Sequence, residues 1–246
     1  MRVLAISSLA VVVVACNDQP PTASSSVNNP FQLTTVYTLE DDGTGGDYVA
    51  RARYYDALGL FDIWGNVGSV ALSGGDLAFV DSTPLDTETR LDVGGAKRVD
   101  YSHKIGRGKP SYVFELRRPN DEVYSATIPA PSQPLVVETK SDPVGTITAK
   151  WTPVPDANLI ARATSDVCST SVETPDGNRE RDMGASTVRV RYTAGQQCTV
   201  ELTIERRTKV SVAARWLKKG KEQLPSPGVW AETLAVSSTK VVMTKP

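Results

Sequence analysis

The sequence predicts an all-β protein in which two β-sandwich domains in tandem follow a signal peptide and a flexible stalk. Three observations support this prediction. Apolar and polar residues alternate in many short runs, turn-forming Gly, Pro, Asn and Asp separate these runs, and no stretch combines a sustained 3.6-residue apolar period with a cap and a stop. A chain of 246 residues, 40% of them hydrophobic and 22% charged, is long enough for two domains.

The first sixteen residues begin with Arg2 and continue as an almost unbroken apolar run from Val3 to Val14. Crossing about 30 Å of hydrocarbon takes roughly 20 helical residues, so this run is too short to span a bilayer. It is typical of an export signal. The polar, Pro-rich segment that follows, residues 17–30, cannot bury enough apolar surface to fold, and we expect it to form a flexible stalk.

The signal closes with Val13-Val14-Ala15-Cys16, which resembles the lipobox of bacterial lipoproteins. In that family the cysteine sulfur receives a diacylglyceryl group, the signal is cut off before it, and the new amino terminus is usually acylated, with palmitate among the chains. The resemblance implies that residues 1–15 are removed and that residues 16–30 start with a lipidated Cys16. Two or more acyl chains anchor a protein durably, so it also implies a membrane-bound envelope protein that faces the periplasm or the cell surface.

Residues 31–130 form the first predicted domain. The alternating runs 33–39 and 48–55, separated by the turn Asp41–Asp47, predict a hairpin. The carboxylates of this turn are compatible with a calcium site, but they lack the EF-hand spacing. We therefore favour a solvated turn and predict no metal site. Further strands are expected at 69–72, 77–80, 98–103, 111–118 and 123–128.

The segment Leu58–Gly65 departs from alternation and carries Phe61 and Trp64. These aromatics either grip a partner from an exposed loop or fill one end of the sandwich. Phe61 and Trp64 are therefore the candidate partner-binding residues. Residues 129–134 contain three prolines, which remove backbone donors and exclude a central strand, and the first domain is expected to end at residue 130.

Residues 131–246 form the second predicted domain. Its alternating stretch Gly145–Pro153, which contains Trp-Thr-Pro, is followed by the apolar run Leu159–Thr164. This pattern resembles the early strands of fibronectin type III and related immunoglobulin-like domains, where the tryptophan fills the core between the sheets. The resemblance implies that Trp151 is a core residue with no chemical role.

Cys168 and Cys198 are the only cysteines left once Cys16 is lipidated. An even pair in an exported chain favours a disulfide over a free or metal-bound pair. This is also a departure from fibronectin type III domains, which normally lack one. Strands are further expected at 186–192, 198–205, 209–217, 229–236 and 240–244. The basic turn Lys218–Lys221 either contacts anionic glycan or lipid, or is a solvated hairpin end.

The motifs of catalysis are absent from the sequence. The chain has one histidine, His103, and no nucleophile elbow, zinc-protease motif, phosphate-binding loop or dinucleotide fingerprint. The sequence therefore predicts neither an enzyme nor a cofactor. A hydrolase, the second alternative, would need His103 in a cleft beside a serine or a carboxylate.

The preferred hypothesis is a lipid-anchored, non-catalytic envelope protein that binds or helps to assemble a protein partner through immunoglobulin-like domains. The first alternative is a carbohydrate-binding surface lipoprotein, which would show solvent-exposed aromatics, Trp64 or Tyr54 and Tyr55, along one face. The formal net charge of −1 provides no basic surplus for nucleic-acid binding. No sequence feature sets an oligomeric state.

Overall fold

The computed structural model describes residues 33–56, 69–91, 97–119, 121–131, 134–173, 181–193, 195, 197–218, 220–223 and 229–244. The expected signal peptide, Cys16, the stalk, Phe61 and Trp64 lie outside these residues. The secondary structure of the described residues consists of β-strands, without a helix, which confirms the all-β prediction.

The strands, in chain order, are β1 (Leu33–Asp41), β2 (Tyr48–Asp56), β3 (Leu77–Val80), β4 (Thr83–Pro84), β5 (Asp86–Leu91), β6 (Lys97–Ile105), β7 (Ser111–Arg118), β8 (Glu122–Pro129), β9 (Glu138–Ser141), β10 (Thr146–Lys150), β11 (Ala157–Thr164), β12 (Ser169–Glu173), β13 (Ala185–Arg191), β14 (Gln197–Val210), β15 (Ala213–Lys218), β16 (Lys221–Gln223) and β17 (Val229–Thr244). They form three sheets. The orders are β11-β14-β17-β1-β2-β6-β5, β12-β13-β10-β9 and β16-β15-β8-β7-β3-β4.

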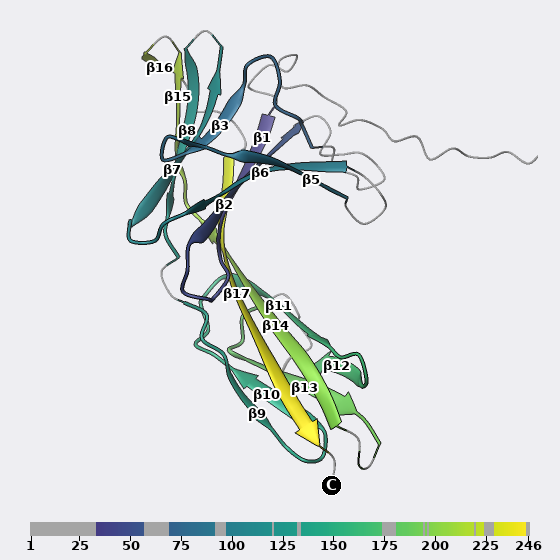
Figure 1. The fold of residues 1–246 in the computed structure, drawn as a ribbon. Helices are drawn as coiled ribbons and strands as arrows, with labels where there is room; N and C mark the ends of the chain where they lie inside the picture. Colours follow the sequence, from purple (N-terminus) through teal and green to yellow (C-terminus); the bar gives the residue numbers. More distant parts are fainter. Residues whose placement is uncertain are drawn as a thin grey trace, which may run out of the picture.

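These sheets build two lobes, each with its own hydrophobic core, joined at an angle (Figure 1). The seven-stranded sheet belongs to both lobes. Its β1, β2, β5 and β6 end packs against the six-stranded sheet in the first lobe, and its β11 end packs against the four-stranded sheet in the second. Each lobe is therefore a β-sandwich, and one sheet is common to both.

Aromatic side chains fill the first lobe between its two sheets. Tyr37 of β1 lies 4.8 Å from Phe114 of β7, between ring centroids, and Tyr48 of β2 meets the edge of Tyr112 of β7 at 5.9 Å. These residues follow the period of two, because each strand alternates core-facing and outward-facing side chains. The alternation in the sequence therefore locates the core faces of these strands.

The second lobe has the strand order of an immunoglobulin constant-type sandwich. Its sheets, β12-β13-β10-β9 and β11-β14-β17, follow the D-E-B-A and C-F-G arrangement. Trp151 directly follows β10, is 8% exposed and lies in this core, as the resemblance implied. Its indole nitrogen donates to Asp182 Oδ1 at 2.7 Å. The indole therefore buries its apolar surface and satisfies its one donor.

The predicted disulfide is present between Cys168 and Cys198. Cys198 begins the apolar face of β14 and is fully buried, and Cys168 immediately precedes β12. The bond therefore links the C–D connection of the sandwich to its F strand. In antibody domains the disulfide instead joins strands B and F.

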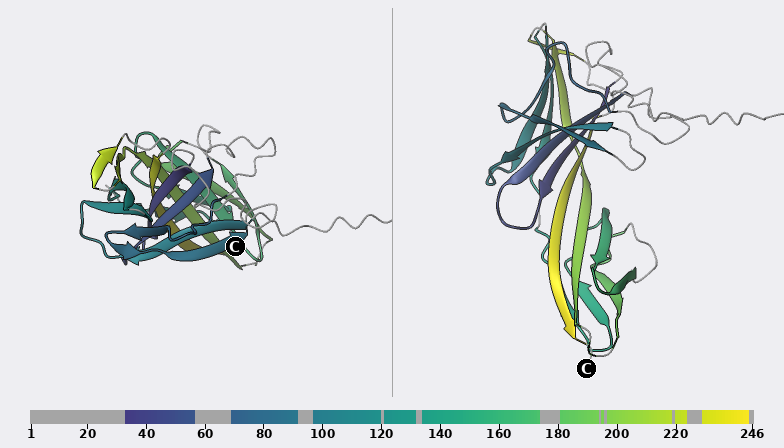
Figure 2. Two further views of the ribbon diagram at one scale, coloured as in Figure 1. Left: turned by 90° about the horizontal axis from the view of Figure 1, so that it is seen from above. Right: turned by 45° about the vertical axis from the view of Figure 1, so that its right-hand side comes forward.

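Two long strands connect the lobes. β14 pairs antiparallel with β17 from Gln197↔Thr244 to Val210↔Ala231, so this one pair of strands extends through both lobes (Figure 2). β1 then pairs parallel with the first half of β17, from Thr35↔Val229 to Asp41↔Ala235. As a result, strands from the two ends of the described chain lie side by side in the middle of the sheet.

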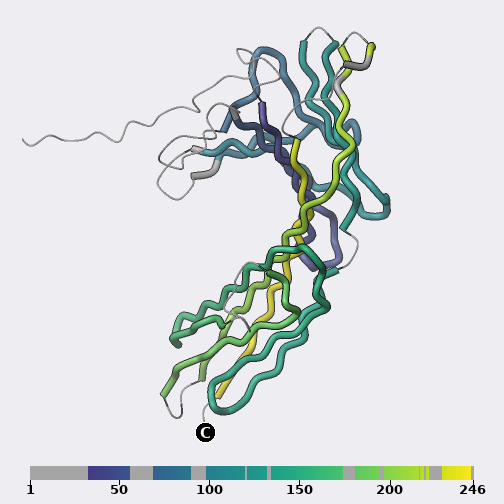
Figure 3. The backbone as a smooth tube through the Cα atoms, turned by 180° about the vertical axis from the view of Figure 1, so that it is seen from behind, coloured from purple at the N-terminus to yellow at the C-terminus, as the bar shows by residue number. Residues whose placement is uncertain are grey.

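The two hydrophobic cores do not follow the expected domain boundary between residues 130 and 131. The β8–β9 connection does pass from one lobe to the other, but β14 and β17 pass between them as well (Figure 3). Val210 packs on the first core and Ala231 belongs to it, and β15 pairs with β8. Residues 131–246 therefore do not form a separate domain, because Val210, β15 and Ala231 contribute to the first lobe.

The β1–β2 turn is fitted against β17 at the junction of the lobes. Gly43 has a φ of +74°, and a Cβ there would lie 2.5 Å from the carbonyl oxygen of Val236. Both the backbone conformation and the close approach require glycine. This turn is the predicted hairpin connection, and the antiparallel β1–β2 pairing confirms the hairpin.

Removal of the disulfide is expected to destabilise the protein. The variant Cys168→Ala/Cys198→Ala loses the closure of a loop whose ends are 30 residues apart, which contributes about 3 to 4 kcal/mol to the free energy of unfolding. Urea unfolding, monitored by circular dichroism, measures the difference. Wild-type protein treated with a reductant is the control and should lose a similar amount. A loss below about 1 kcal/mol in both would contradict the loop-closure argument.

The stability of the first lobe is expected to fall at alkaline pH. Burial raises the pKa values of Tyr37 and Tyr54 above the ordinary 10.0. Above pH 10 the unfolded chain releases these protons while the folded chain retains them, so the free energy of unfolding falls by about 1.4 kcal/mol per pH unit for each such tyrosine. In the variant Tyr37→Phe/Tyr54→Phe, the free energy of unfolding measured with urea should fall less steeply with pH than in the wild type. Full phenolate absorbance in the still-folded wild type would contradict this.

Candidate binding surface

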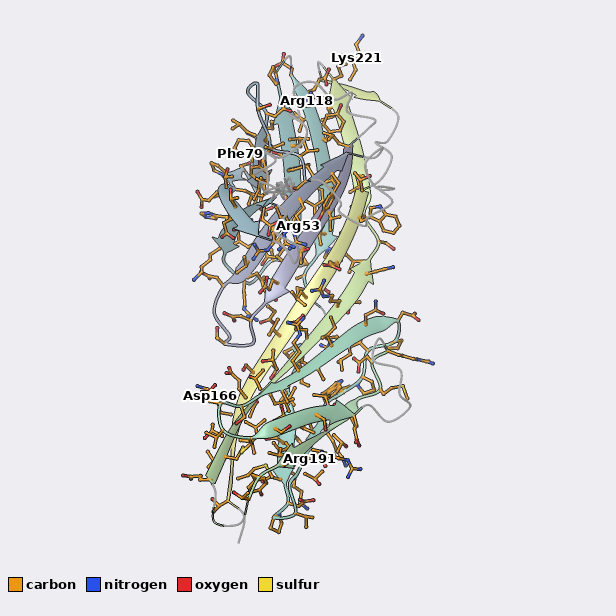
Figure 4. The ribbon with its side chains drawn as sticks, turned by 90° about the vertical axis from the view of Figure 1, so that its right-hand side faces the viewer. Arg53, Phe79, Arg118, Asp166, Arg191 and Lys221 are labelled. Carbon is orange, nitrogen blue, oxygen red and sulfur yellow. A yellow bond between two sulfur atoms is a disulfide. The ribbon has the colours of Figure 1, made fainter. Side chains whose placement is uncertain are left out.

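The seven-stranded sheet has one face that belongs to neither core. Residues opposite each other in the register share a face, so residues paired with core positions point inward and their sequence neighbours point outward. We call the outward face the open face, and Figure 4 looks onto its part in the first lobe, with Arg53 near the middle of that lobe. It carries Thr38, Glu40, Glu88, Arg51, Arg53, Arg98, Asp100, Ser102, Arg162, Glu205, Arg207, Lys209, Trp230 and Glu232.

Ion pairs cross the open face from the second lobe to the middle of the sheet. Arg162 of β11 lies 3.8 Å from Glu205 of β14, and Arg207 of β14 lies 3.6 Å from Glu205 and 3.7 Å from Glu232 of β17. The Thr38 hydroxyl of β1 then donates to Glu232 Oε1 at 3.4 Å. This half of the open face is partly exposed and contributes little to stability.

The series continues over the first lobe through Arg51 of β2. Its guanidinium lies 3.5 Å from Glu40 of β1, 3.3 Å from Glu88 of β5 and 3.4 Å from Asp100 of β6. The Arg51 side chain is 8% exposed, so its charge is largely removed from water and depends on these three carboxylates. Polar contacts thus extend over all seven strands of the sheet.

Asp100 is the most deeply buried charge of the open face. Its side chain has no exposed surface, and Oδ1 accepts from Arg53 Nε at 2.8 Å and lies 3.2 Å from Arg98 Nε. Ser102 on the same strand donates to Glu88 Oε1 at 2.7 Å. Alternating signs on neighbouring strands therefore hold the arginine side chains in fixed positions.

A large aromatic side chain stands on the open face beside this charged network. Trp230 of β17 is 57% exposed and lies opposite Val36 of β1 in the register. The amine of Lys209 lies 6.0 Å from its ring centroid. A tryptophan held on a rigid strand, with polar groups around it, has the composition of an interface hot spot.

His103 lies on β6 and lines neither the cavity beside Leu33 and Leu116 nor the one beside Pro131 and Thr233. Its Nδ1 lies 3.2 Å from Asp86 Oδ2, and the Asp86 side chain is 80% exposed. The hydrolase alternative required a cleft around His103 beside a serine or carboxylate. In the described structure Asp86 is the carboxylate beside His103, and it lies on an exposed surface.

The acidic turn Asp41–Asp47 is closed by an arginine. Arg107 donates to both oxygens of Asp41, at 2.6 and 3.1 Å, and its Nε donates to the carbonyl of Gly46. These bonds raise the pKa of Arg107 above its usual value. Asp42 instead accepts from the amide and hydroxyl of Thr44, which lowers the pKa of Asp42. In the described part of the chain, no three His, Cys, Asp or Glu side chains gather as metal ligands.

Two of the residues proposed for a glycan platform, Tyr54 and Tyr55, do not share an exposed face. Tyr54 is fully buried in the first core, whereas Tyr55 points to the opposite side of β2 and is half-buried. In the basic turn, Lys218 pairs with Glu122 of β8 at 2.7 Å, and Lys221 projects from the tip of the first lobe (Figure 4). One lysine of that turn is thus engaged within the protein.

Comparison with known protein families found no family that matches the chain, and comparison with curated proteins found no match. Among the described residues, no helix is long and apolar enough to cross a membrane.

The open face could not be found from single stretches of sequence. Glu232 and Thr38 are 194 residues apart, and only the parallel β1–β17 pairing brings them together. The detectable signal was local, namely the charged outward positions of alternating strands such as Arg51 and Arg53. Trp230 lies in the predicted strand 229–236, and the sequence pattern does not distinguish it from a core residue.

Neutralising Asp100 is expected to lower the free energy of unfolding strongly. Asp100→Asn removes the charge shared by Arg51, Arg53 and Arg98 and leaves Arg51 less compensated, so the free energy of unfolding should fall by about 3 to 5 kcal/mol. Urea unfolding measures this change. Glu173→Gln, which breaks the exposed pair with Arg189, is the matched control and should cost less than about 1 kcal/mol. Equal losses of stability in the two variants would contradict the argument that a buried ion pair matters more than an exposed one.

Proposed function

We propose that the chain is a lipid-anchored, non-catalytic protein of the bacterial cell envelope that binds a protein partner through its open face. The proposal joins two observations from different parts of the chain. The first is the lipobox-like end of the apolar segment at Val13–Cys16, which indicates export and attachment. The second, which carries the binding role, is the exposed Trp230 on a rigid sheet face.

Attachment through Cys16 provides a covalent membrane partner. A diacylglyceryl group on the sulfur together with an amide-linked acyl chain makes a durable anchor, whereas a single chain would bind reversibly. Residues 17–30 then separate the folded lobes from the anchor by at most about 45 to 50 Å. The open face can thus reach envelope proteins close to the membrane on which the chain is held.

Trp230 supports a protein partner because of what surrounds it. On β17 it is followed at the next outward position by Glu232, which is held by Arg207 and Thr38. An apolar anchor beside fixed charges of both signs combines an energetic contact with a pattern that selects the partner. The long β14–β17 ladder keeps this pattern rigid, so little conformational entropy is lost on binding.

Site-specific photo-cross-linking in intact native cells tests the proposal. A photo-reactive aromatic residue at position 230 should give a discrete set of adducts with envelope proteins. The same residue at Val242 is the matched control, because Val242 lies on the same strand and the same face, 56% exposed against 57% for Trp230, but in the second lobe. We expect position 242 to give at most a small fraction of the adducts.

The Cys16→Ser variant tests the anchor in the same cells. Mass spectrometry of the N-terminal peptide should show the acyl chains in the wild type and none in the variant, and the adducts at position 230 should be lost with the anchor. Identical adduct patterns from positions 230 and 242 would overturn binding through the open face. An unmodified Cys16 in the wild type would overturn the lipid anchor.

A further inference from the structure

A cleft lies between the two lobes, on the inner side of the sheet that they share. It has a volume of about 130 Å³, and its walls include Pro129 at the end of β8, Pro131 in the β8–β9 connection, Val154 after β10, and Arg206, Thr208 and Thr233 on the long strands. This space accommodates a small organic group. Ligand sites are frequent at such junctions.

Arg206 places a charge where the strand pattern calls for a core residue. It follows Leu202 and Ile204 on the inward face of β14, both of which are fully buried in the second core. Arg206 itself is 4% exposed, and its guanidinium donates to the carbonyl oxygen of Thr152 at 3.2 Å. Burial lowers the pKa of Arg206 from its ordinary value, because the charged form has lost much of its hydration.

One carboxylate that acts on Arg206 is that of Asp182, which also accepts hydrogen bonds within its own loop. Asp182 Oδ1 accepts from the Trp151 indole at 2.7 Å and from the amide of Gly184 at 3.0 Å, and Oδ2 accepts from the amide of Val154 at 3.1 Å. The attraction of Asp182 for Arg206 opposes the effect of burial but is the smaller of the two. Arg206 thus places a cationic group in the wall of the cleft.

Two hydroxyl groups lie beside this charge. Thr208 of β14 and Thr233 of β17 are directly opposite each other in the register, one inward position beyond the pair Arg206↔Ala235. Both line the cleft, and Thr233 is 7% exposed. The facing walls, built by prolines and Val154, are apolar. One polar wall of cationic and hydroxyl donors opposite apolar walls is suited to a small anion that has a short apolar part.

We propose that this interlobe cleft binds a carboxylate group, with Arg206 pairing with its oxygens and the hydroxyls of Thr208 and Thr233 donating to them. Planar guanidinium groups match carboxylates in geometry as well as in charge. The size of the cleft suits a small group with a short apolar part. This site is separate from the open face and does not depend on the proposed partner binding.

Ligand-detected NMR titration of the full-length chain with acetate and propionate tests the proposal. Both should bind saturably, while the matched neutral amides, acetamide and propionamide, should not, since they lack the charge. Arg206→Met is expected to weaken acetate binding about tenfold or more, and Thr208→Val and Thr233→Val about fivefold each. Arg162→Met, which removes an exposed arginine from the open face, is the control and should leave binding unchanged.

Thermal melting followed by circular dichroism verifies that each variant is folded, and the two threonine variants keep the test decisive if Arg206→Met does not fold. A short peptide amide with a single glutamate distinguishes the sources of the carboxylate. Its displacement of acetate identifies a polypeptide side chain, whereas acetate binding without competition identifies a small free acid. Either result supports the site. The absence of saturable acetate binding, equal binding of acetamide, or unchanged binding in the Arg206 and threonine variants would overturn it.

Discussion

The pairing of β14 with β17 is the interaction on which both lobes depend. Its fourteen register positions extend from Gln197 to Val210, so a single ladder supplies core side chains to the second lobe at one end and to the first lobe at the other. Two sandwiches joined by a single linker can change their relative orientation when the linker bends. Here a bend would also have to distort the hydrogen bonds of a continuous sheet, and the angle between the lobes is therefore a property of the sheet.

The change from apolar to polar side chains along β14 marks the place where the cores separate. Inward residues are apolar up to Ile204, become Arg206 and Thr208 at the junction, and are apolar again at Val210. A polar interval on a strand that keeps its period of two leaves the ladder intact while it interrupts the core. The same strand thus separates two cores and still holds them together, and its outward side carries Glu205 and Arg207 of the open face.

Local sequence patterns predicted the strands well and their partners poorly. The runs 77–80 and 111–118 coincide with β3 and β7, and the hairpin around Asp41–Asp47 was identified from its turn residues. In contrast, Val229–Val236 and Lys240–Thr244 were expected as two strands but form the single β17, because Ser237–Thr239 lack the apolar signal although their backbone continues the ladder.

The arrangement of the lobes depended on contacts that no short stretch encodes. The parallel pairing of β1 with β17 joins residues from the two ends of the described chain. Val229 and Ala231 of β17 consequently lie at the first core, although the sequence assigned them to the second domain. The disulfide and the core position of Trp151 were predictable because a cysteine pair and a Trp-Thr-Pro strand end have narrow structural meanings. The open face and the interlobe cleft required the register itself.

The position of β1 beside β17 also sets the order in which the protein can fold. A chain is made from its amino terminus, and β1 remains without its parallel neighbour until Val229–Ala235 have been synthesised. The core of the first lobe likewise waits for Ala231. Contacts between such distant residues slow folding, since the intervening chain must close a long loop first. The first lobe therefore cannot complete its core before these residues have been made, and until then its strands remain in the unfolded state that can pass through a narrow translocation channel.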